Sequence, residues 1–250
     1  MIKFAWEIRY MNRQHAVVTG ASRGIGKAIA EKFAEAGFDL TIACFSNSDM
    51  LDELADRLRK EYGIACNTFS GDLSLYKSVE TLFKGIKRVD VLINNAGISY
   101  TGLLQDMHPD DWNRIISVNL SSAFYCSKLA IPLMLSRKSG KILNISSVWG
   151  EYGSSMEVAY SASKGGLNAF TRALGKELAP SNIQVNAIAC GIIDTDMNKI
   201  FKQEEIASII EDIPADRMGY PGEVADLALQ LCSGNQYLTG QIITLDGGWM

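Results

Sequence analysis

Three side chains in the second half of the chain have the types and spacing needed for proton transfer to a substrate oxygen. Tyr160 and Lys164 lie four residues apart in the predicted helix 157–178, so they share one helix face. A protonated lysine beside a tyrosine favours the phenolate and lowers the tyrosine pKa, which suits proton exchange near neutral pH. Ser147 follows the predicted strand Lys141–Ile145, where its hydroxyl can bond the same oxygen. A Tyr and a Lys at this spacing are common by chance, so the interpretation depends on the residues around them.

A glycine-rich loop near the start of the chain has the composition of a phosphate-binding turn. It joins the apolar strand Ala16–Val18 to a helix with apolar periodicity over Gly24–Ala36. Its first glycine permits a tight turn, its second lets the backbone approach a pyrophosphate, and its third lets the helix pack near the strand. The helix N-terminus then offers free N–H groups to phosphates. The alternative is a turn without a ligand. The residues assigned to a dinucleotide here are Gly20, Ser22, Arg23, Gly24, Ile25 and Gly26.

The residues that would meet the adenosine ribose favour NADPH over NADH. An NAD site usually presents an acid at the end of the second strand. That strand, Leu40–Phe45, is followed by Ser46 and Asn47, and Asp39 lies at its opposite end. Arg23 in the glycine loop can pair with a 2′-phosphate, and Ser46 can add a hydroxyl. The alternative is that Arg23 is a solvated surface residue.

The apolar patterning predicts strands that alternate with helices along the whole chain. Several strands are apolar without alternation, as expected when helices cover both faces of a parallel, doubly wound sheet. The further predicted strands are Ile64–Phe69, Val89–Asn94, Ile183–Ala189 and Ile242–Leu245, and the further helices are 49–61, 74–86, Pro109–Ser136, 203–211 and 222–232. Residues 11–250 are expected to form one domain, in which the segment 191–220 follows a strand end and is a candidate substrate lid.

Two sets of asparagines complete the candidate site. Asn94, Asn95, Ala96 and Gly97 follow the fourth predicted strand, and these asparagines either brace the sheet or contact the cofactor. Asn119 lies within the long predicted helix, where asparagine is unfavourable, and is either a surface residue or part of the site.

Composition excludes several other classes of protein. The chain has 250 residues, 47% of them hydrophobic and 21% charged, with a net charge of −4 and no basic cluster, so we expect no nucleic-acid partner. Five cysteines without a C-x-x-C pair argue against a disulfide framework or a zinc site and favour the cytoplasm. His15 and His108 have no second ligand at metal-binding spacing. Charges interrupt the N-terminal extension 1–10, which therefore reads as neither a signal peptide nor a membrane span.

Together these motifs resemble the classical short-chain dehydrogenase/reductase family over about residues 14–249. The resemblance implies a single-domain Rossmann-like fold with a seven-stranded parallel sheet and a homotetramer. It implies that Asn119, Ser147, Tyr160 and Lys164 form the catalytic tetrad: Tyr160 as acid, Lys164 on the nicotinamide ribose, Ser147 on the carbonyl, and Asn119 opening its helix to a relay water. It further implies cofactor contacts at Asp72 with Leu73, at Ile193 and at Thr195.

Within that family the chain is most similar to 3-oxoacyl-[acyl-carrier-protein] reductases. The similar stretches are residues 19–26, residues 160–166 and the tail from Tyr237 to Gly248. Two positions depart from the pattern: Cys190 replaces the usual proline, and Tyr125 stands where an arginine often docks the carrier, with Lys128 and Arg172 as substitutes. The resemblance implies NADPH-dependent reduction of a 3-oxoacyl thioester. The alternatives are another small alcohol or ketone, such as a sugar, steroid or polyketide, a non-catalytic NADPH sensor, and a purely structural oligomer.

Overall fold

The fold is built on one parallel sheet of seven strands. The computed structural model describes residues 13–200 and 203–250, so the predicted extension 1–10 lies outside the described residues. The strands lie in the order β3-β2-β1-β4-β5-β6-β7, and every pair is parallel. The order reverses between β1 and β4, as in a Rossmann-like sheet. Their bounds are β1 His15–Thr19, β2 Asp39–Cys44, β3 Cys66–Ser70, β4 Val91–Asn94, β5 Gly140–Ser147, β6 Ile183–Cys190 and β7 Ile242–Leu245.

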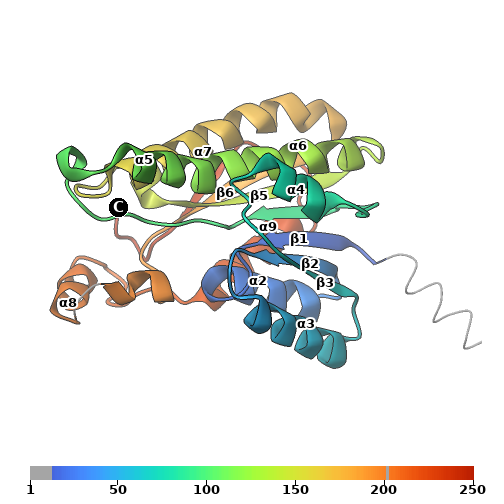
Figure 1. The fold of residues 1–250 in the computed structure, drawn as a ribbon, viewed down its shortest axis with the longest axis horizontal. Helices are drawn as coiled ribbons and strands as arrows, with labels where there is room; N and C mark the ends of the chain where they lie inside the picture. Colours follow the sequence, from blue (N-terminus) through green and yellow to red (C-terminus); the bar gives the residue numbers. More distant parts are fainter. Residues whose placement is uncertain (1–12, 201–202) are drawn as a thin grey trace, which may run out of the picture.

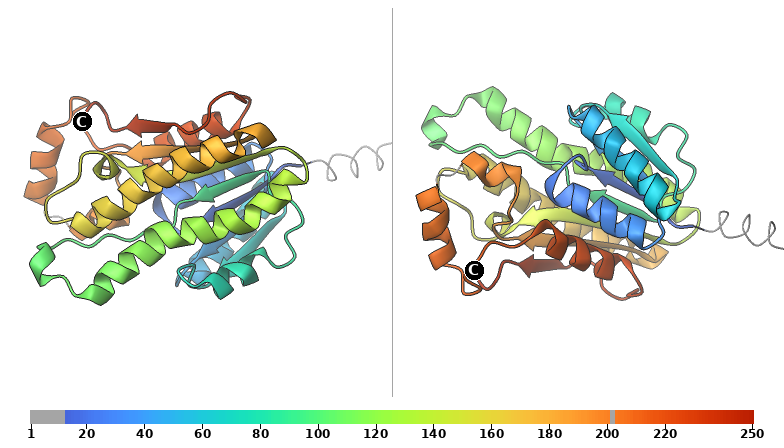
Figure 2. Two further views of the ribbon diagram at one scale, coloured as in Figure 1. Left: turned by 90° about the horizontal axis from the view of Figure 1, so that it is seen from above. Right: turned by 90° about the horizontal axis from the view of Figure 1, so that it is seen from below.

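Helices cover both faces of the sheet, as Figures 1 and 2 show. One layer contains α2 Gly24–Glu35, α3 Ser48–Tyr62 and α9 Pro221–Cys232. The other contains α4 Tyr76–Phe83, α5 Pro109–Ile116, α6 Ser122–Leu135 and α7 Val158–Leu178. The short helix α8 Gln203–Glu211 lies away from both layers, at the end of the molecule where the strands reach their carboxyl ends. This arrangement confirms the predicted doubly wound α/β fold.

The two hydrophobic cores follow from the alternation of side chains along each strand. In β1, Ala16 and Val18 pack with Phe33 of α2, whereas Val17 points to the opposite face and packs with Met134 of α6. All five side chains are fully buried. Because successive residues of a strand point to opposite faces, a strand covered on both sides is apolar at most of its positions. This explains why the continuous apolar runs were a reliable guide to the strands.

The predicted helix Pro109–Ser136 ends at Leu135 in the structure and is interrupted by a π-helical turn over Ser117–Ser121. This stretch is long and apolar enough to span a membrane by length and composition alone. In the structure it covers the sheet, and 44% of its most apolar window is buried within the fold. Its buried Ser127 accepts a hydrogen bond from Asn94 of β4, at 3.3 Å. These contacts are those of a core helix.

The segment 191–220 is more structured than its sequence indicates. It contains a 3-10 turn over Asp196–Ile200 and the helix α8. A parallel β-bridge between Ile193 and Gly219 closes the segment at its base, with the Gly219 N–H bonded to Ile192 O at 3.0 Å. The predicted lid is therefore a helical segment whose two ends are hydrogen-bonded to each other beside β6.

Candidate active site

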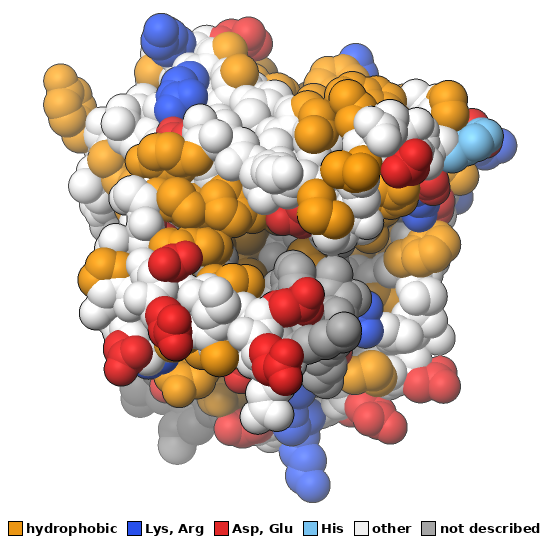
Figure 3. All heavy atoms as spheres, turned by 90° about the vertical axis from the view of Figure 1, so that its left-hand side faces the viewer, with side chains coloured by type: hydrophobic (Ala, Val, Ile, Leu, Met, Phe, Trp, Pro, Cys, Tyr) orange, Lys and Arg blue, Asp and Glu red, His pale blue; other side chains and the backbone are white. Residues whose placement is uncertain are grey.

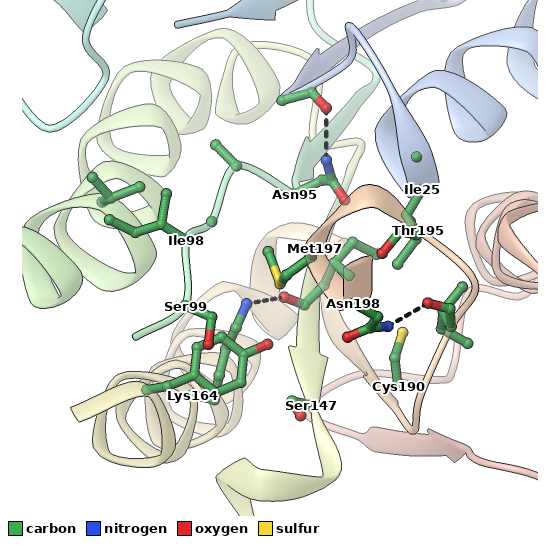
Figure 4. Close-up of a pocket in the computed structure, with 18 of the residues that line it drawn as sticks. Ile25, Asn95, Ile98, Ser99, Ser147, Lys164, Cys190, Thr195, Met197 and Asn198 are labelled. Atoms are coloured by element: carbon green, nitrogen blue, oxygen red, sulfur yellow. Dashed lines mark hydrogen bonds between the residues drawn. The ribbon is translucent and has the colours of Figure 1, made fainter. Parts of the chain in front are cut away.

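A cavity of about 720 Å³ opens at the carboxyl ends of the strands. Figure 4 shows Asn95, Ser147 and Lys164 lining it from three different elements. The structure brings nearly all the predicted site residues into this one cavity. The three exceptions are Gly26, Asn94 and Asn119, which are outside its lining, and Asn94 instead donates to Asn144 Oδ1 within the sheet at 2.8 Å.

The glycine loop is shaped by close backbone approaches. Gly20 has a φ of +67°, which favours glycine, and a Cβ there would lie 2.9 Å from Ala96 Cα. A Cβ on Gly26 would lie 2.2 Å from Gly20 O, so the first turn of α2 can pack against the loop only when this residue is glycine. Asn95 donates from Nδ2 to Thr19 O and Gly20 O, at 2.9 and 3.0 Å. Asn95 therefore braces the loop, which supports the structural role that the sequence left open.

The N-terminus of α2 is suited to an anionic ligand. Among the described residues, no side chain caps this helix and no acid lies in its first turn, so its first N–H groups face the cavity beside Gly24 and Ile25. An uncapped N-terminus with a positive dipole end is a ready site for phosphates. The glycine loop and this helix end thus fit the pyrophosphate of a dinucleotide.

At the end of the cavity where the sequence predicts the adenosine ribose there is a cation and, among the described residues, no carboxylate at the end of β2. Ser46 and Asn47 line the cavity there, after Phe45. The Arg23 side chain is 60% exposed and its guanidinium lies 3.6 Å from Asp196. Asp39 is confirmed at the far end of β2, where it accepts a hydrogen bond from Ala65 N at 2.8 Å.

Asp72 lines the same end of the cavity and is held in a defined orientation. Its carboxylate accepts hydrogen bonds from the Ser74 hydroxyl and from Arg114, both at 2.7 Å. Burial raises the pKa of Asp72, but the bonds from Ser74 and Arg114 outweigh it and the pKa lies below its ordinary value. Leu73 beside it is 6% exposed and joins the hydrophobic core. This pair forms a rigid edge of the cavity at the place where the family resemblance predicts a cofactor contact.

Ser147, Tyr160 and Lys164 meet at the centre of the cavity. Ser147 ends β5, and its hydroxyl accepts a hydrogen bond from Trp149 N at 3.2 Å. Lys164 is 4% exposed, and its ammonium donates to Ile145 O at 2.8 Å. The Lys164 Nζ lies 5.6 Å from the centre of the Tyr160 ring, as the shared helix face predicts. A phenol, a hydroxyl and an ammonium therefore converge on one point.

The predicted direction of the Tyr160 pKa shift is wrong for this structure. Burial raises the pKa of Tyr160 above its ordinary value, and hydrogen bonding to Ser147 only partly opposes the shift. Burial also lowers the pKa of Lys164 to about 8. The prediction rests on the attraction between a lysine and a phenolate. In the structure, desolvation of the phenolate and of the ammonium has the larger effect on both pKa values.

Asn119 lies inside the π-helical turn and is 1% exposed. Its Oδ1 accepts a hydrogen bond from Ile98 N at 2.8 Å, and its Nδ2 donates to Ile98 O and to the Ser163 hydroxyl at 2.9 and 3.0 Å. The surface alternative for Asn119 is therefore wrong. It joins the loop after β4 to the helix that carries Tyr160 and Lys164, which is the geometry of a positioning residue.

The lid side of the cavity carries the remaining predicted contacts. Ile193 is 5% exposed, and Thr195 lies so close to the glycine loop that a Cβ on Gly24 would be 3.4 Å from its Cγ2. Cys190 also lines the cavity at the end of β6. Burial raises the pKa of the Cys190 thiol to about 12, so the thiol stays protonated and is a poor nucleophile.

Sequence reasoning missed the residues on the substrate side. Glu157 accepts a hydrogen bond from the Ser99 hydroxyl at 2.7 Å, and both line the cavity. Trp149 and Trp249 form an edge-to-face pair with ring centroids 5.0 Å apart, and they also line it. The glycine pair before Trp249 signals a turn, but only the fold shows that the turn leads back to the site.

Known proteins that resemble this chain identify its family. The family model described as short chain dehydrogenase matches residues 14–206. The chain is 40% identical over 238 residues to a 3-oxoacyl-[acyl-carrier-protein] reductase FabG of Aquifex aeolicus, covering 93% of this chain and 96% of that protein. It is 38% identical over 236 residues to an uncharacterized oxidoreductase, YmfI, of Bacillus subtilis, covering 94% and 98%.

The same architecture occurs in a solved structure that is named for a different activity. The acetoin dehydrogenase YohF from Salmonella typhimurium superposes with a TM-score of 0.86 at 35% identity, covering 95% of this chain and 96% of that one. Enzymes of this family use a nicotinamide cofactor and act on carbonyl or alcohol groups, and the glycine loop and central cavity fit that chemistry. The chain therefore belongs to the short chain dehydrogenase family of oxidoreductases.

Proposed function

We propose that the protein reduces a 3-oxoacyl thioester to the 3-hydroxyacyl form with NADPH. The observation that carries the proposal is the convergence of Ser147, Tyr160 and Lys164 in the cavity that also contains the uncapped helix end of α2. The similarity to 3-oxoacyl-[acyl-carrier-protein] reductases supports the substrate class.

In this proposal the chain's own groups handle the oxygen and the proton. NADPH, when bound, supplies the hydride. Ser147 donates a hydrogen bond to the carbonyl oxygen, and Tyr160 gives its phenolic proton to that oxygen as negative charge develops. The raised pKa of Tyr160 keeps the proton in place until then. The Lys164 ammonium stabilises the phenolate that remains, and the proton returns from solvent.

Arg23 supports NADPH as the reductant, because it lines the cavity while the end of β2 has no carboxylate among its described residues. We expect Arg23→Ala to raise the Kd for NADPH about tenfold and to leave that for NADH within twofold, since a partly exposed charge-assisted contact is lost. Fluorescence titration of both cofactors measures this, and Arg57→Ala, which removes an exposed arginine paired with Glu31, is the matched control. Equal losses for both cofactors would argue that Arg23 is structural.

The activity is tested by the loss of nicotinamide absorbance with an acetoacetyl thioester, using NADPH and NADH in parallel. Fast oxidation of NADPH alone is the expected result. Tight NADPH binding without oxidation would overturn the thioester proposal and would lead to a panel of ketones and alcohols. Binding without turnover on that whole panel would favour a redox sensor.

A second candidate, a small ketone without a carrier, is favoured by the surface around the cavity. Glu204 and Glu205 lie in the first turn of α8, and Asp110 and Asp111 lie in the first turn of α5; both helices contribute to the cavity. Figure 3 shows acidic side chains gathered on this face. An acidic opening disfavours an anionic carrier.

The position of the missing carrier-docking arginine, Tyr125, and one of its two expected substitutes, Arg172, also favour this second candidate. Tyr125 packs edge-on against Tyr76, with ring centroids 5.3 Å apart. Arg172 is already engaged with Glu151, at 2.9 Å. Rates with a small ketone such as acetoin's diketone, diacetyl, compared with rates with a carrier-bound acetoacetyl thioester, separate the two candidates.

The homotetramer, which the family resemblance implies, and the cytoplasmic location, which the cysteine pattern favours, stay predictions. Exposed apolar side chains on α5, α6 and α7 support a subunit interface on that layer of helices. They are Trp112, Phe124, Leu135 and Val158.

A further inference from the structure

Trp249 lines the same cavity as Tyr160, although it lies four residues beyond the end of β7. Its ring lies edge-on to Trp149, at an interplanar angle of 63°. Trp149 follows Ser147 by two residues and is tied to it by the bond from its N–H to the Ser147 hydroxyl. The indole pair therefore begins beside the group that would hold the carbonyl oxygen.

The segment 246–250 that carries Trp249 is fixed by its own turn. The Asp246 carboxylate accepts hydrogen bonds from Gly248 N and Met250 N, at 3.0 and 2.9 Å. Gly247 and Gly248 have φ values of +72° and +86°, which reverse the chain. An aspartate that bonds the backbone two residues on, followed by glycines with positive φ, is a stable turn. Trp249 is thus held in one place.

Two neighbouring segments hold this turn against the site. The Gly191 N–H donates to Leu245 O at 2.9 Å, and a Cβ on Gly191 would lie 2.8 Å from Asp246 Cα. On the lid side, Ala215 N donates to Gly247 O at 3.1 Å. The segment therefore fits between the end of β6 and the end of the lid only because residue 191 lacks a side chain.

We propose that Trp149 and Trp249 form the wall of the substrate subsite that contacts the carbon chain next to the reacting carbonyl, and that this wall limits the length of that chain. The inference rests on the proposed function and deepens it. Edge-to-face indoles form a rigid apolar surface. A pocket of fixed depth discriminates about tenfold or more for each methylene that it cannot hold. Trp249 is then a specificity-determining residue supplied from outside the predicted catalytic tetrad.

The test measures binding of two 3-oxo esters to the full chain loaded with NADP⁺, so that no turnover occurs. We expect wild-type protein to bind ethyl acetoacetate at least tenfold more tightly than ethyl 3-oxooctanoate in a calorimetric titration. Trp249→Ala and Trp149→Ala should each reduce this preference tenfold or more. Tyr237→Ala is the control, because Tyr237 is 98% exposed and is outside the cavity lining.

An unchanged Kd for NADP⁺ shows that each variant is folded, and Trp249→Leu replaces the alanine variant if that one does not fold. The proposal is overturned if both alanine variants keep the wild-type preference within twofold while binding NADP⁺ normally. Failure of the proposed function looks different. In that case wild-type protein oxidises NADPH with neither the esters nor the thioester, while the binding preference is still measurable.

Discussion

Tyr160→Phe should lower kcat for ketone reduction by about 10²–10⁴-fold, the range expected when a positioned general acid is removed. The variant keeps the ring that packs near Lys164 and loses only the hydroxyl. The Kd for NADPH should stay within a few-fold of the wild-type value, because the glycine loop and the end of α2 are untouched. Steady-state kinetics with the acetoacetyl thioester and a cofactor titration measure the two quantities separately.

Tyr237→Phe is the control for this substitution, because Tyr237 is 98% exposed and lies outside the cavity lining. It should have wild-type kinetics. A Tyr160→Phe enzyme with a kcat within tenfold of wild type would show that another group delivers the proton. A variant that loses NADPH binding as well would place Tyr160 in cofactor binding rather than in proton transfer.

The strands could be predicted because their physics is local. A buried parallel strand is apolar at most consecutive positions, and Val91–Ile93 of β4 and Ala187–Cys190 of β6 show that pattern in the sequence itself. The boundaries were less certain, and β3 begins at Cys66 rather than at residue 64. The π-helical turn around Asn119 could not be predicted from residue types. The bonds that stabilise this turn, from Asn119 to Ile98 and to Ser163, come from distant segments of the chain.

Features of the site that depend on residue spacing could be predicted from the sequence. Features that depend on burial could not. The shared helix face of Tyr160 and Lys164 follows from their separation of four residues. Their pKa shifts depend on how much protein surrounds them, which only the fold determines, and burial reversed the predicted direction for Tyr160. Trp249 was missed for the same reason, since its contact with Trp149 joins residues 100 positions apart in the sequence.

Burial of Lys164 has a consequence for stability as well as for catalysis. A charged ammonium that is 4% exposed, with Ile145 O as its hydrogen-bond acceptor, costs folding free energy at neutral pH. A site of this kind is retained for function although it reduces stability. Replacing the ammonium by an apolar side chain of similar length should therefore separate the two effects.

Lys164→Met should lower kcat at least about 100-fold and make the stability gap to wild type depend on pH. In wild-type protein the pKa is 10.5 for the free side chain and about 8 in the fold. Between these values the unfolded state holds a proton that the folded state has lost, so wild-type stability rises with pH. The variant's advantage should therefore shrink from pH 7 to 10, by at most about 3 kcal/mol. Loss of the hydrogen bond to Ile145 changes the stability difference between the variant and wild type by the same amount at every pH, so the pH dependence of that difference is unaffected. Urea unfolding across this pH range measures the stability difference. Lys176→Met, at an exposed position on the same helix, is the control. A difference that does not change with pH would contradict a buried, protonated Lys164 at pH 7.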